Sequence, residues 1–528
     1  MTTSNLPTRA PKTPPAVVLD AGQGQDQSIT DALQFNEALP LMLVSTLERR
    51  YLSGFRPGDW RIEPREGDTA RPVLRPIEAL GRPDQRAEWA RSMPHVLTAC
   101  HDNGHALVMA LHGQGERHRL YLGGRRLIGA GGGSTQDYMA SQESAFKAYF
   151  TGLRTGPVAG LDSEGLPEMS TLLQTAPVMA AVTGIPSGRG KSLALDLQSL
   201  DRLVRAVGNQ RYVLMVVAEP IDPFEIDATL DACRRLKGEI HAYTNRTVSR
   251  VTGQNSSASH REKDPTTAKG LDKPMILYGA AIFMGLAGAF VPGMDGLMKL
   301  MQPTSSMAMM ANMRDGRDGD ANARQVSDGT STSDSSSVNL LNANAEACEQ
   351  LLQQHIQRLQ AGRSGGWWRT AVYVAAENDA ALESVTGALR SLCSGDESAL
   401  DPMRVVPLPA YLGRSAIEQG QVLSLHPSMG DQGHPLGPSY DALATPLTSD
   451  ELAVLVNLPR QEIPGLPMRD IADFALSVPP PTADSIALGV LQDGVGRDLE
   501  EVTVTSAALN RHVFVTGITG CGKTNTCM

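Results

Sequence analysis

The chain has 528 residues, of which 41% are apolar, 20% are charged and only 4% are aromatic. This length can bury the cores of about two to four domains, which excludes a short peptide and a wholly disordered chain. The net charge of −10 excludes a basic surface for nucleic acid over the whole chain, although a local basic channel can still form on assembly.

The N-terminal residues and the cysteines indicate a cytoplasmic protein. Residues 1–38 are rich in proline, threonine, glutamine and glycine without periodicity, which predicts a disordered tail. They contain no apolar segment of the kind found in a secretory signal. The six cysteines are widely spaced and form no C-x-x-C pair or zinc-ligand spacing with histidine, so we interpret them as reduced thiols.

The composition becomes globular after the tail, and residues 39–248 are predicted to form a mixed α+β adaptor domain. Short β-rich segments at 105–111 and 119–124 are bounded by glycines. Residues 211–220 form an apolar strand pattern, and 221–240 follow with apolar residues at helical spacing. This part therefore contains strands alternating with helices.

A second strand and helix of the same design occur later in the chain. The strand pattern covers 367–378, the helical pattern covers 379–395, and a short apolar run follows at 404–409. We expect this part, within 341–480, to complete the sheet of the adaptor and to include the connector to the next domain.

Residues 249–340 separate the two halves and are predicted to be a flexible insert, because their ends are rich in serine, asparagine, aspartate and glycine. Inside it, 275–294 holds twenty residues without a charge, a length that matches a bilayer core. A single crossing would place the two halves of one sheet on opposite sides of the membrane. We favour a helix buried against another subunit or partner. The alternative is a re-entrant or interfacial hairpin that bends near Pro292 and Gly293.

The strongest chemical signal lies in RHVFVTGITGCGKTNTCM, residues 511–528, where a short predicted strand at Val513 to Val515 precedes the pattern G-x-x-x-x-G-K-T. Glycines at this spacing let backbone N–H groups turn toward a β-phosphate, while the following helix presents its positive N-terminus. Lys523 is predicted to reach the β- and γ-phosphates, and the Thr524 hydroxyl to bind Mg²⁺. The predicted nucleotide-binding residues are Gly517, Ile518, Thr519, Gly520, Cys521, Gly522, Lys523, Thr524 and Asn525, with Lys523 and Thr524 as the catalytic pair.

A second, similar stretch at 184–192, GIPSGRGKS, is interpreted as a surface turn. Five residues rather than four separate Gly184 from Gly190, and Pro186 removes a backbone donor that a phosphate loop needs. We expect a helix to follow at 200–207.

Two further groups are given structural interpretations. Three histidines and one cysteine lie close together in the sequence, namely His95, Cys100, His101 and His105. Their spacing matches no common zinc motif, so we expect ordinary surface or core side chains. Trp367 and Trp368 could stack on bases, but the start of a half-buried strand explains them with fewer assumptions.

The segment 486–527 resembles the entry into the motor domain of the HerA/FtsK superfamily of P-loop ATPases. That group reads L-x-x-H-x-x-x-x-G-x-T-G-x-G-K-[ST], and the matching residues here are Leu509, His512, Gly517, Thr519, Gly520, Gly522, Lys523 and Thr524. The upstream segment 447–476 is similar to the helix and LP…PG connection that precedes the motor in HerA-like and type IV secretion ATPases. Cys521 stands where the family commonly has serine or alanine.

This resemblance implies that 481–528 hold the strands of a small β-barrel, followed by the first strand and P-loop of a RecA-like domain. It also implies a hexameric ring that uses ATP and Mg²⁺ to move a polymer, usually double-stranded DNA. We expect the chain to be truncated just after the motif, because a Walker B pair, a sensor and an arginine finger do not follow Thr524. The 528 residues alone are therefore expected to be inactive.

Three functions remain open from the sequence. The first is the N-terminal part of an ATP-dependent DNA translocase or helicase, whose adaptor recruits a nuclease or another effector. The second is the energising ATPase of a secretion or conjugation system, with peripheral membrane contact through 275–294. The third is a non-catalytic docking scaffold.

Overall fold

The computed structural model describes part of the chain in detail. The described residues are 40–55, 60–64, 71–82, 86–102, 104–127, 133–188, 200–252, 262–263, 323–324, 334–427, 433–470, 478, 480–492, 497–510 and 514–516. They divide into two compact units. The larger unit holds the described residues of 45–238 and 350–516, and the smaller unit holds those of 40–44 and 239–349.

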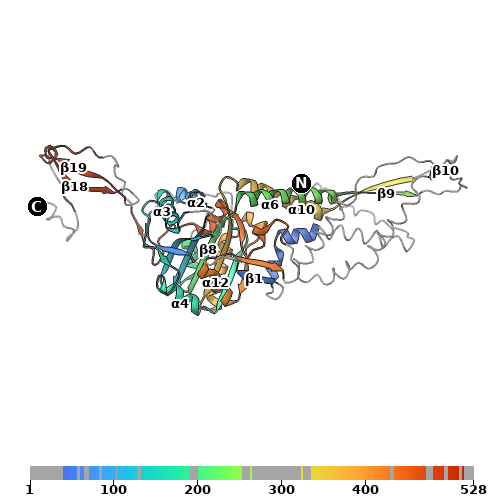
Figure 1. The fold of residues 1–528 in the computed structure, drawn as a ribbon, viewed down its shortest axis with the longest axis horizontal. Coiled ribbons are helices and arrows are strands. Elements are labelled where there is room, and N and C mark those ends of the chain that lie inside the picture. The colour runs from blue at the N-terminus through green and yellow to red at the C-terminus, as the bar shows by residue number, and fades with distance from the viewer. Residues whose placement is uncertain are drawn as a thin grey trace, which may run out of the picture. The chain divides into compact units, whose positions relative to one another are not determined.

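One large sheet forms the centre of the larger unit (Figure 1). Its strands lie in the spatial order β14 (Arg404–Leu408), β7 (Val178–Thr183), β13 (Trp367–Ala376), β8 (Arg211–Pro220), β3 (His105–Gln114), β4 (His118–Arg126), β2 (Val73–Gly81) and β17 (Met468–Arg469). Three short strands join at the margins, namely β16 (Thr445–Thr448) on β13, and β5 (Arg154–Thr155) and β6 (Ala159–Gly160) on β2. Every pair is antiparallel except β17 with β2.

The two halves predicted from the sequence meet at the centre of this sheet. Strand β13 pairs with β8 over nine positions, with Val372 opposite Val216. Both strands are buried along almost their whole length, which explains why they read as continuous apolar runs rather than as alternating patterns. The expectation that the two halves share one sheet is therefore confirmed.

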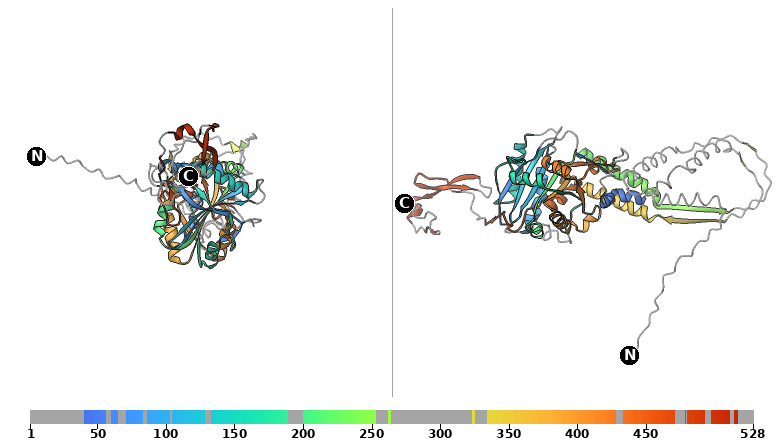
Figure 2. Two further views of the ribbon diagram at one scale, coloured as in Figure 1. Left: turned by 90° about the vertical axis from the view of Figure 1, so that its left-hand side faces the viewer. Right: turned by 90° about the horizontal axis from the view of Figure 1, so that it is seen from below.

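Helices cover both faces of the sheet, as Figures 1 and 2 show. One core lies under α2 (Arg86–Cys100), α3 (Thr135–Tyr149), α5 (Leu200–Val207), α11 (Asp379–Cys393) and α13 (Ser449–Val456). The other lies under α4 (Pro167–Thr175) and α12 (Ala410–Gln419). Strand β3 shows how one strand serves both, because Leu107 and Leu111 enter the first core while Ala106 and Val108 enter the second.

Local sequence signals set the starts of several helices. Helix α11 begins after Asn378, whose side chain accepts a hydrogen bond from the Ala381 N–H at 2.9 Å. Helix α13 begins with a capping box between Thr448 and Glu451. These side chains satisfy backbone donors that a helix N-terminus leaves unpaired, so each helix starts where its cap stands.

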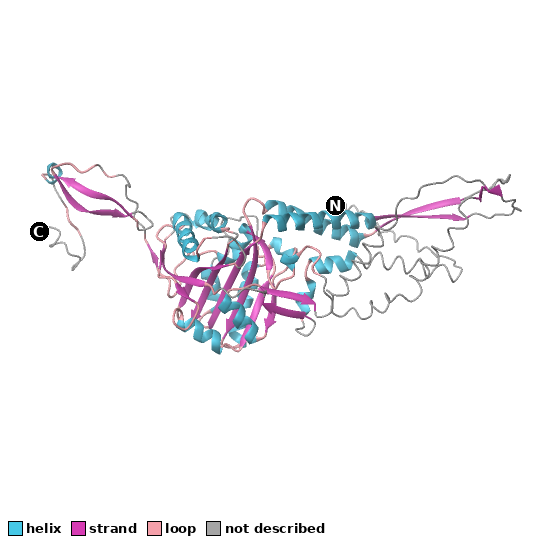
Figure 3. Ribbon diagram, in the orientation of Figure 1, coloured by secondary structure: helices cyan, strands magenta, loops and turns pink. Residues whose placement is uncertain are grey.

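The remaining elements of the two units are not strands of the large sheet (Figure 3). In the larger unit they are η1 (Arg50–Gly54), the pair β1 (Trp60–Pro64) and β15 (Leu423–Pro427), η3 (Asp396–Ala399) and η4 (Pro438–Tyr440). The long helices α6 (Pro223–Thr244) and α10 (Ala343–Ala361) contribute residues to both units. In the smaller unit, β9 (Asn245–Thr252) pairs with β12 (Asp334–Leu341), and β10 (Glu262–Lys263) pairs with β11 (Ala323–Arg324), both antiparallel.

The C-terminal part forms an antiparallel hairpin instead of the expected barrel. Strand β18 (Ser485–Gln492) pairs with β19 (Asp498–Thr505), and α14 (Ser506–Leu509) follows. No closed barrel occurs in the described residues, because two strands cannot close a sheet on themselves. A RecA-like parallel sheet is also not evident among them. The fold is therefore mixed α/β with a large antiparallel sheet.

The structure also bears on the membrane hypothesis. None of the helices in the described part is long and apolar enough to cross a membrane. The uncharged segment 275–294 lies outside the described residues, so its place in a buried helix or an interfacial hairpin stays a prediction.

Candidate functional site

The predicted nucleotide loop lies outside the described residues. This holds for Gly517, Ile518, Thr519, Gly520, Cys521, Gly522, Lys523, Thr524 and Asn525. Just before the loop, 514–516 have no regular secondary structure, so the strand expected at Val513 to Val515 does not form over its last two residues. A strand exists only where its backbone groups pair with a neighbour, and no strand in the described part lies beside this segment.

The hairpin that leads to the loop is closed at its base by hydrogen bonds. The Ser506 N–H and hydroxyl both donate to the carbonyl of Asp484, at 2.9 and 3.1 Å. The Thr505 hydroxyl accepts from the Ala508 N–H at 3.3 Å and caps α14. These bonds fix the point at which the chain leaves β19 toward the predicted loop.

The hairpin also exposes apolar side chains. Leu488 is 62% exposed, and Ile486 and Val490 are half exposed; beyond the hairpin, Phe514 is 89% exposed. A two-stranded hairpin has little intrinsic stability in water. This part of the chain therefore has none of the burial that stabilises the large sheet.

Inside the large sheet, an ionic cluster takes side chains from the three strands β4, β8 and β13, with β3 lying between β4 and β8. The Arg125 guanidinium on β4 donates to one oxygen of Glu219 on β8 at 2.7 Å, and Arg369 on β13 lies 3.4 Å from the other oxygen. Arg369 also donates to both oxygens of Glu225, at 3.0 and 3.1 Å, and to the Ser439 hydroxyl at 2.9 Å. Glu219, Arg125 and Arg369 are buried. Each carboxylate of this cluster is paired with a guanidinium inside the protein, so we assign the cluster to folding.

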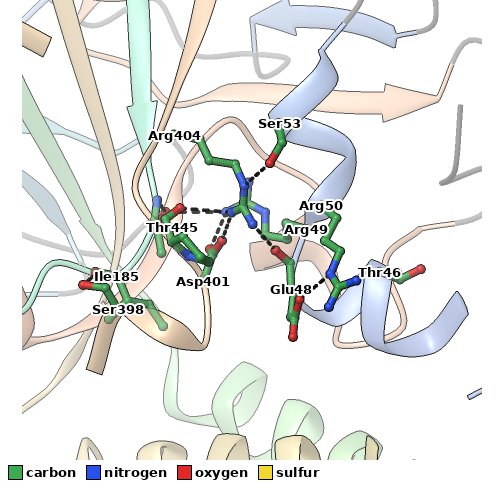
Figure 4. Close-up of polar contacts among 12 residues, drawn as sticks. Thr46, Glu48, Arg49, Arg50, Ser53, Ile185, Ser398, Asp401, Arg404 and Thr445 are labelled. Atoms are coloured by element: carbon green, nitrogen blue, oxygen red, sulfur yellow. Dashed lines mark hydrogen bonds and ion pairs between the residues drawn. The ribbon is translucent and has the colours of Figure 1, made fainter. Parts of the chain in front are cut away.

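A second buried cluster joins residues 45–55 to the sheet (Figure 4). Arg49 is fully buried and donates to the carbonyls of Ala444 and Ala442, at 2.7 and 2.9 Å. Asp401 lies 3.5 Å from Arg49 and also bonds Arg404. Arg404 in turn donates to the Glu48 carbonyl and to Ser53, each at 2.8 Å. Apart from the local pair of Asp401 and Arg404, these contacts hold one segment of the chain against another, so we assign the cluster to folding.

The histidine and cysteine group does not converge. The His95 ring stacks on Tyr149, the His101 Nε2 lies 3.0 Å from the Trp367 carbonyl oxygen, and the His105 Nδ1 lies 3.0 Å from an oxygen of Asp102. Burial raises the pKa of the Cys100 thiol to about 12. Within the described ranges, no three histidine, cysteine or acidic side chains are placed to hold a metal ion.

The tandem tryptophans are core residues. Trp367 is 1% exposed and Trp368 is fully buried, and the Trp368 indole N–H donates to the Ser449 hydroxyl at 3.0 Å. The Arg358 guanidinium carbon lies 4.9 Å from the Trp367 ring centroid. A base cannot stack on buried rings, so the structural interpretation holds, although the burial is complete rather than partial.

A cleft of about 290 Å³ lies beside Trp367, between the end of α2 and the start of α6. His101 and Gly366 line it, and the ion pair between Arg363 and Asp227, at 2.6 Å, lies on its rim. The His101 ring and both rim charges already have partners within the protein. The cleft therefore has no set of free charged groups with which to perform chemistry.

The near-miss stretch is only partly described. Gly184 has a φ of +120°, and its N–H donates to the Thr445 hydroxyl at 2.8 Å. The Ile185 N–H donates to the carbonyl of Asp401, also at 2.8 Å. Residues 189–199, which include Lys191, lie outside the described residues. The described half is buried and forms no regular turn, with Ile185 1% and Ser187 5% exposed, so the surface turn expected for this stretch is wrong over these residues. Their backbone groups are instead taken up by contacts with segments far away in the chain.

Sequence reasoning missed both ionic clusters. The available signal was a charged residue inside an otherwise apolar strand, as with Glu219 and Arg369, but their partners lie 94 and 150 positions away along the chain.

A scan against protein-family models finds no match, and a search of curated proteins finds no relative.

Proposed function

We propose that this chain is the N-terminal part of an ATP-dependent DNA translocase or helicase of the HerA/FtsK type. The observation that carries the proposal is the sequence G-I-T-G-C-G-K-T at 517–524, preceded by Leu509 and His512 at the spacing of that superfamily. In this proposal Lys523 binds the β- and γ-phosphates of ATP, and Thr524 binds Mg²⁺. The loop opens a RecA-like domain, and the β18–β19 hairpin is part of the segment that leads into it.

The distribution of charge in the larger unit supports a proposal in which this unit is an adaptor and the phosphate loop binds ATP. Among the described residues, its buried acidic and basic side chains other than Asp201 are paired with one another, as in the cluster around Glu219. The cleft beside Trp367 also lacks free charged groups. A scaffold with neutralised interior charges suits an adaptor that positions the ATPase and recruits an effector, while the chemistry resides in the phosphate loop.

Nucleotide binding is the first test of the proposal. Titration with a fluorescent ATP analogue and Mg²⁺ should show saturable binding, and Lys523→Ala should weaken it by about 10- to 100-fold, because a charge-assisted contact to phosphate is lost. The matched control is Lys191→Ala, which changes the lysine of the near-miss stretch and should leave the affinity unchanged. Equal losses in the two variants, or no binding by the parent protein, would refute the assignment.

Cys521 offers an independent measurement at the same loop. Burial raises the pKa of Cys100, Cys233, Cys348 and Cys393 to about 12, so these thiols should resist alkylation in the native protein. If Cys521 lies in a phosphate loop, ATP and Mg²⁺ should slow its alkylation, and Lys523→Ala should remove that protection. Peptide mapping by mass spectrometry identifies the modified cysteine.

The polymer and the assembly form a separate part of the proposal. Translocases of this type act as hexamers on double-stranded DNA, so ATP turnover by a protein that contains the complete motor should rise with duplex DNA, and this stimulation should fall steeply with salt. Native mass spectrometry gives the subunit number. Turnover that ignores DNA would argue against the translocase.

One sequence feature favours the secretion ATPase as a second candidate. The uncharged segment 275–294 has the length and composition of a membrane-active segment. Flotation with anionic vesicles, compared between the parent protein and a variant lacking 275–294, tests this candidate. Binding that depends on the segment would favour secretion, and the absence of binding would favour the translocase.

A further inference from the structure

The connector between α13 and the C-terminal hairpin is attached to the sheet largely through its backbone. This segment, 457–469, is here called the strap. The His118 N–H donates to the Pro464 carbonyl at 2.8 Å, and the Leu80 N–H donates to the Pro467 carbonyl at 3.1 Å. At its end the strap becomes β17, which pairs with β2 over only two positions.

A tight turn presses the strap against the start of β4. Ile463 and Leu466 bridge one another around Pro464 and Gly465, and the Leu466 N–H donates to the Ile463 carbonyl at 2.9 Å. Proline followed by glycine is the sequence of a type II turn, and the φ of Gly465 is +96°. A Cβ at Gly465 would lie 2.5 Å from the carbonyl oxygen of His118. Any larger residue at position 465 would displace the strap from His118.

Two buried polar side chains near the strap's attachment at His118 have no hydrogen-bond partners in the described structure. His118 is 2% exposed and neither of its ring nitrogens has a partner in the described structure, and the same is true of the buried Tyr212 hydroxyl. The two rings are 6.0 Å apart. Burying polar groups without partners is unfavourable, and water would satisfy them if the strap lifted.

Other contacts hold the strap down. Ile463 and Leu466 are buried in the core under α5 and α11. The Asp201 carboxylate accepts from the Arg460 N–H at 3.1 Å. On its outer side, however, the strap borders an open cleft of about 460 Å³ lined by Glu462, Ile463, Pro464, Gly465 and Pro467. Apolar burial therefore opposes the cost of the unpartnered polar groups.

We propose that the strap is a releasable tether, which leaves the sheet locally while the sheet stays folded. Release hydrates the His118 imidazole and the Tyr212 hydroxyl and frees the thirteen residues 457–469. These residues can span up to about 40 Å when extended. A fixed connection thereby becomes a flexible one between the sheet and the chain that follows Arg469. The inference goes beyond the proposed function and does not require nucleotide binding.

Amide hydrogen exchange on the full chain without nucleotide tests the proposal. The amides of His118 and Leu80, which donate to the strap, should exchange faster than amides of the β8–β13 pair, such as that of Val216. Gly465→Ala should accelerate exchange at the strap by about tenfold through backbone strain and the clash with His118, with no change at Val216. The matched control is Gly437→Ala, since Gly437 also has a positive φ, +100°, but has only the Thr229 hydroxyl within 4 Å of a new Cβ, at 3.6 Å.

A second variant gives the opposite expectation and does not depend on tolerating strain. His118→Leu replaces the unpartnered imidazole with an apolar side chain of similar size, so the strap amides should exchange more slowly than in the parent protein. Faster exchange in His118→Leu would overturn the proposal. So would parent strap amides that exchange no faster than Val216, because release would then require global unfolding.

Discussion

The large sheet and the β18–β19 hairpin use the same antiparallel pairing but differ in what covers them. In the sheet, both faces of β13 are buried under helices. In the hairpin, Ile486, Leu488 and Val490 are exposed on a ribbon of two strands. Backbone pairing alone contributes little net stability. We therefore expect the buried sheet to supply most of the free energy of unfolding, and the hairpin that leads to the predicted loop to contribute little to it.

The largest expected effect comes from breaking the ionic cluster of the sheet. Glu219→Ala leaves Arg125 buried without its carboxylate partner, and should reduce the free energy of unfolding by about 3–5 kcal/mol. Glu501→Ala, which removes an exposed glutamate of the hairpin, should change it by less than about 0.5 kcal/mol. Urea denaturation followed by tryptophan fluorescence measures both. Similar losses would show that the two regions unfold as one.

Acid should destabilise the sheet unit through its buried histidines. Burial, with a contribution from Arg358, lowers the pKa of His355 to about 3; burial also lowers that of His434 to about 3 and that of His112 to about 4. The unfolded chain binds these protons near pH 6.5, so the native state is favoured above that pH and loses stability as the pH falls toward about 3 to 4. Each histidine adds a slope of up to about 1.4 kcal/mol per pH unit.

Thermal unfolding between pH 7 and pH 4 measures this slope. His355→Leu should make it shallower, because neither ring nitrogen of His355 has a hydrogen-bond partner in the described structure. His241→Leu is the control, since this ring is largely exposed. A slope unchanged by His355→Leu would contradict the burial of a neutral imidazole at this position.

A smaller effect is expected from the helix caps. Asn378→Ala removes the cap of α11, which packs on the sheet, and should cost about 1 kcal/mol of global stability. Thr505→Ala removes the corresponding cap of α14 beside the hairpin and should leave the global transition unchanged. Denaturant midpoints of the two variants measure these changes in global stability. A loss of stability in Thr505→Ala but not in Asn378→Ala would contradict the expected difference between the sheet and the hairpin.

The smallest effect should follow a change on the exposed face of the hairpin. Leu488→Ser should alter the free energy of unfolding by less than about 0.5 kcal/mol, because its side chain is already in water. Leu111→Ala in β3 is the control and should cost about 2–5 kcal/mol. A large loss in Leu488→Ser would mean that the hairpin is covered in solution, which size-exclusion chromatography would then examine as self-association.

Much of the fold could be predicted from local patterns. The expected strand at 211–220 is β8, the expected strand at 367–378 is β13 (Trp367–Ala376), and the expected helix at 200–207 is α5. Apolar runs bounded by glycine, proline and caps carry this information because burial on both faces demands it. The strand expected before the loop was wrong over Phe514 and Val515, because an apolar run forms a strand only where a neighbour pairs with it.

The sequence by itself determined the candidate chemistry, since the spacing of glycines, lysine and threonine at 517–524 is local and defines the phosphate site that we propose. Only the tertiary structure decided which charged and polar residues are structural. Glu219 meets Arg125 and Arg369, and Gly465 meets His118, through contacts between residues far apart in the chain. Such contacts follow from how strands are ordered in the sheet, and local periodicity does not carry that order.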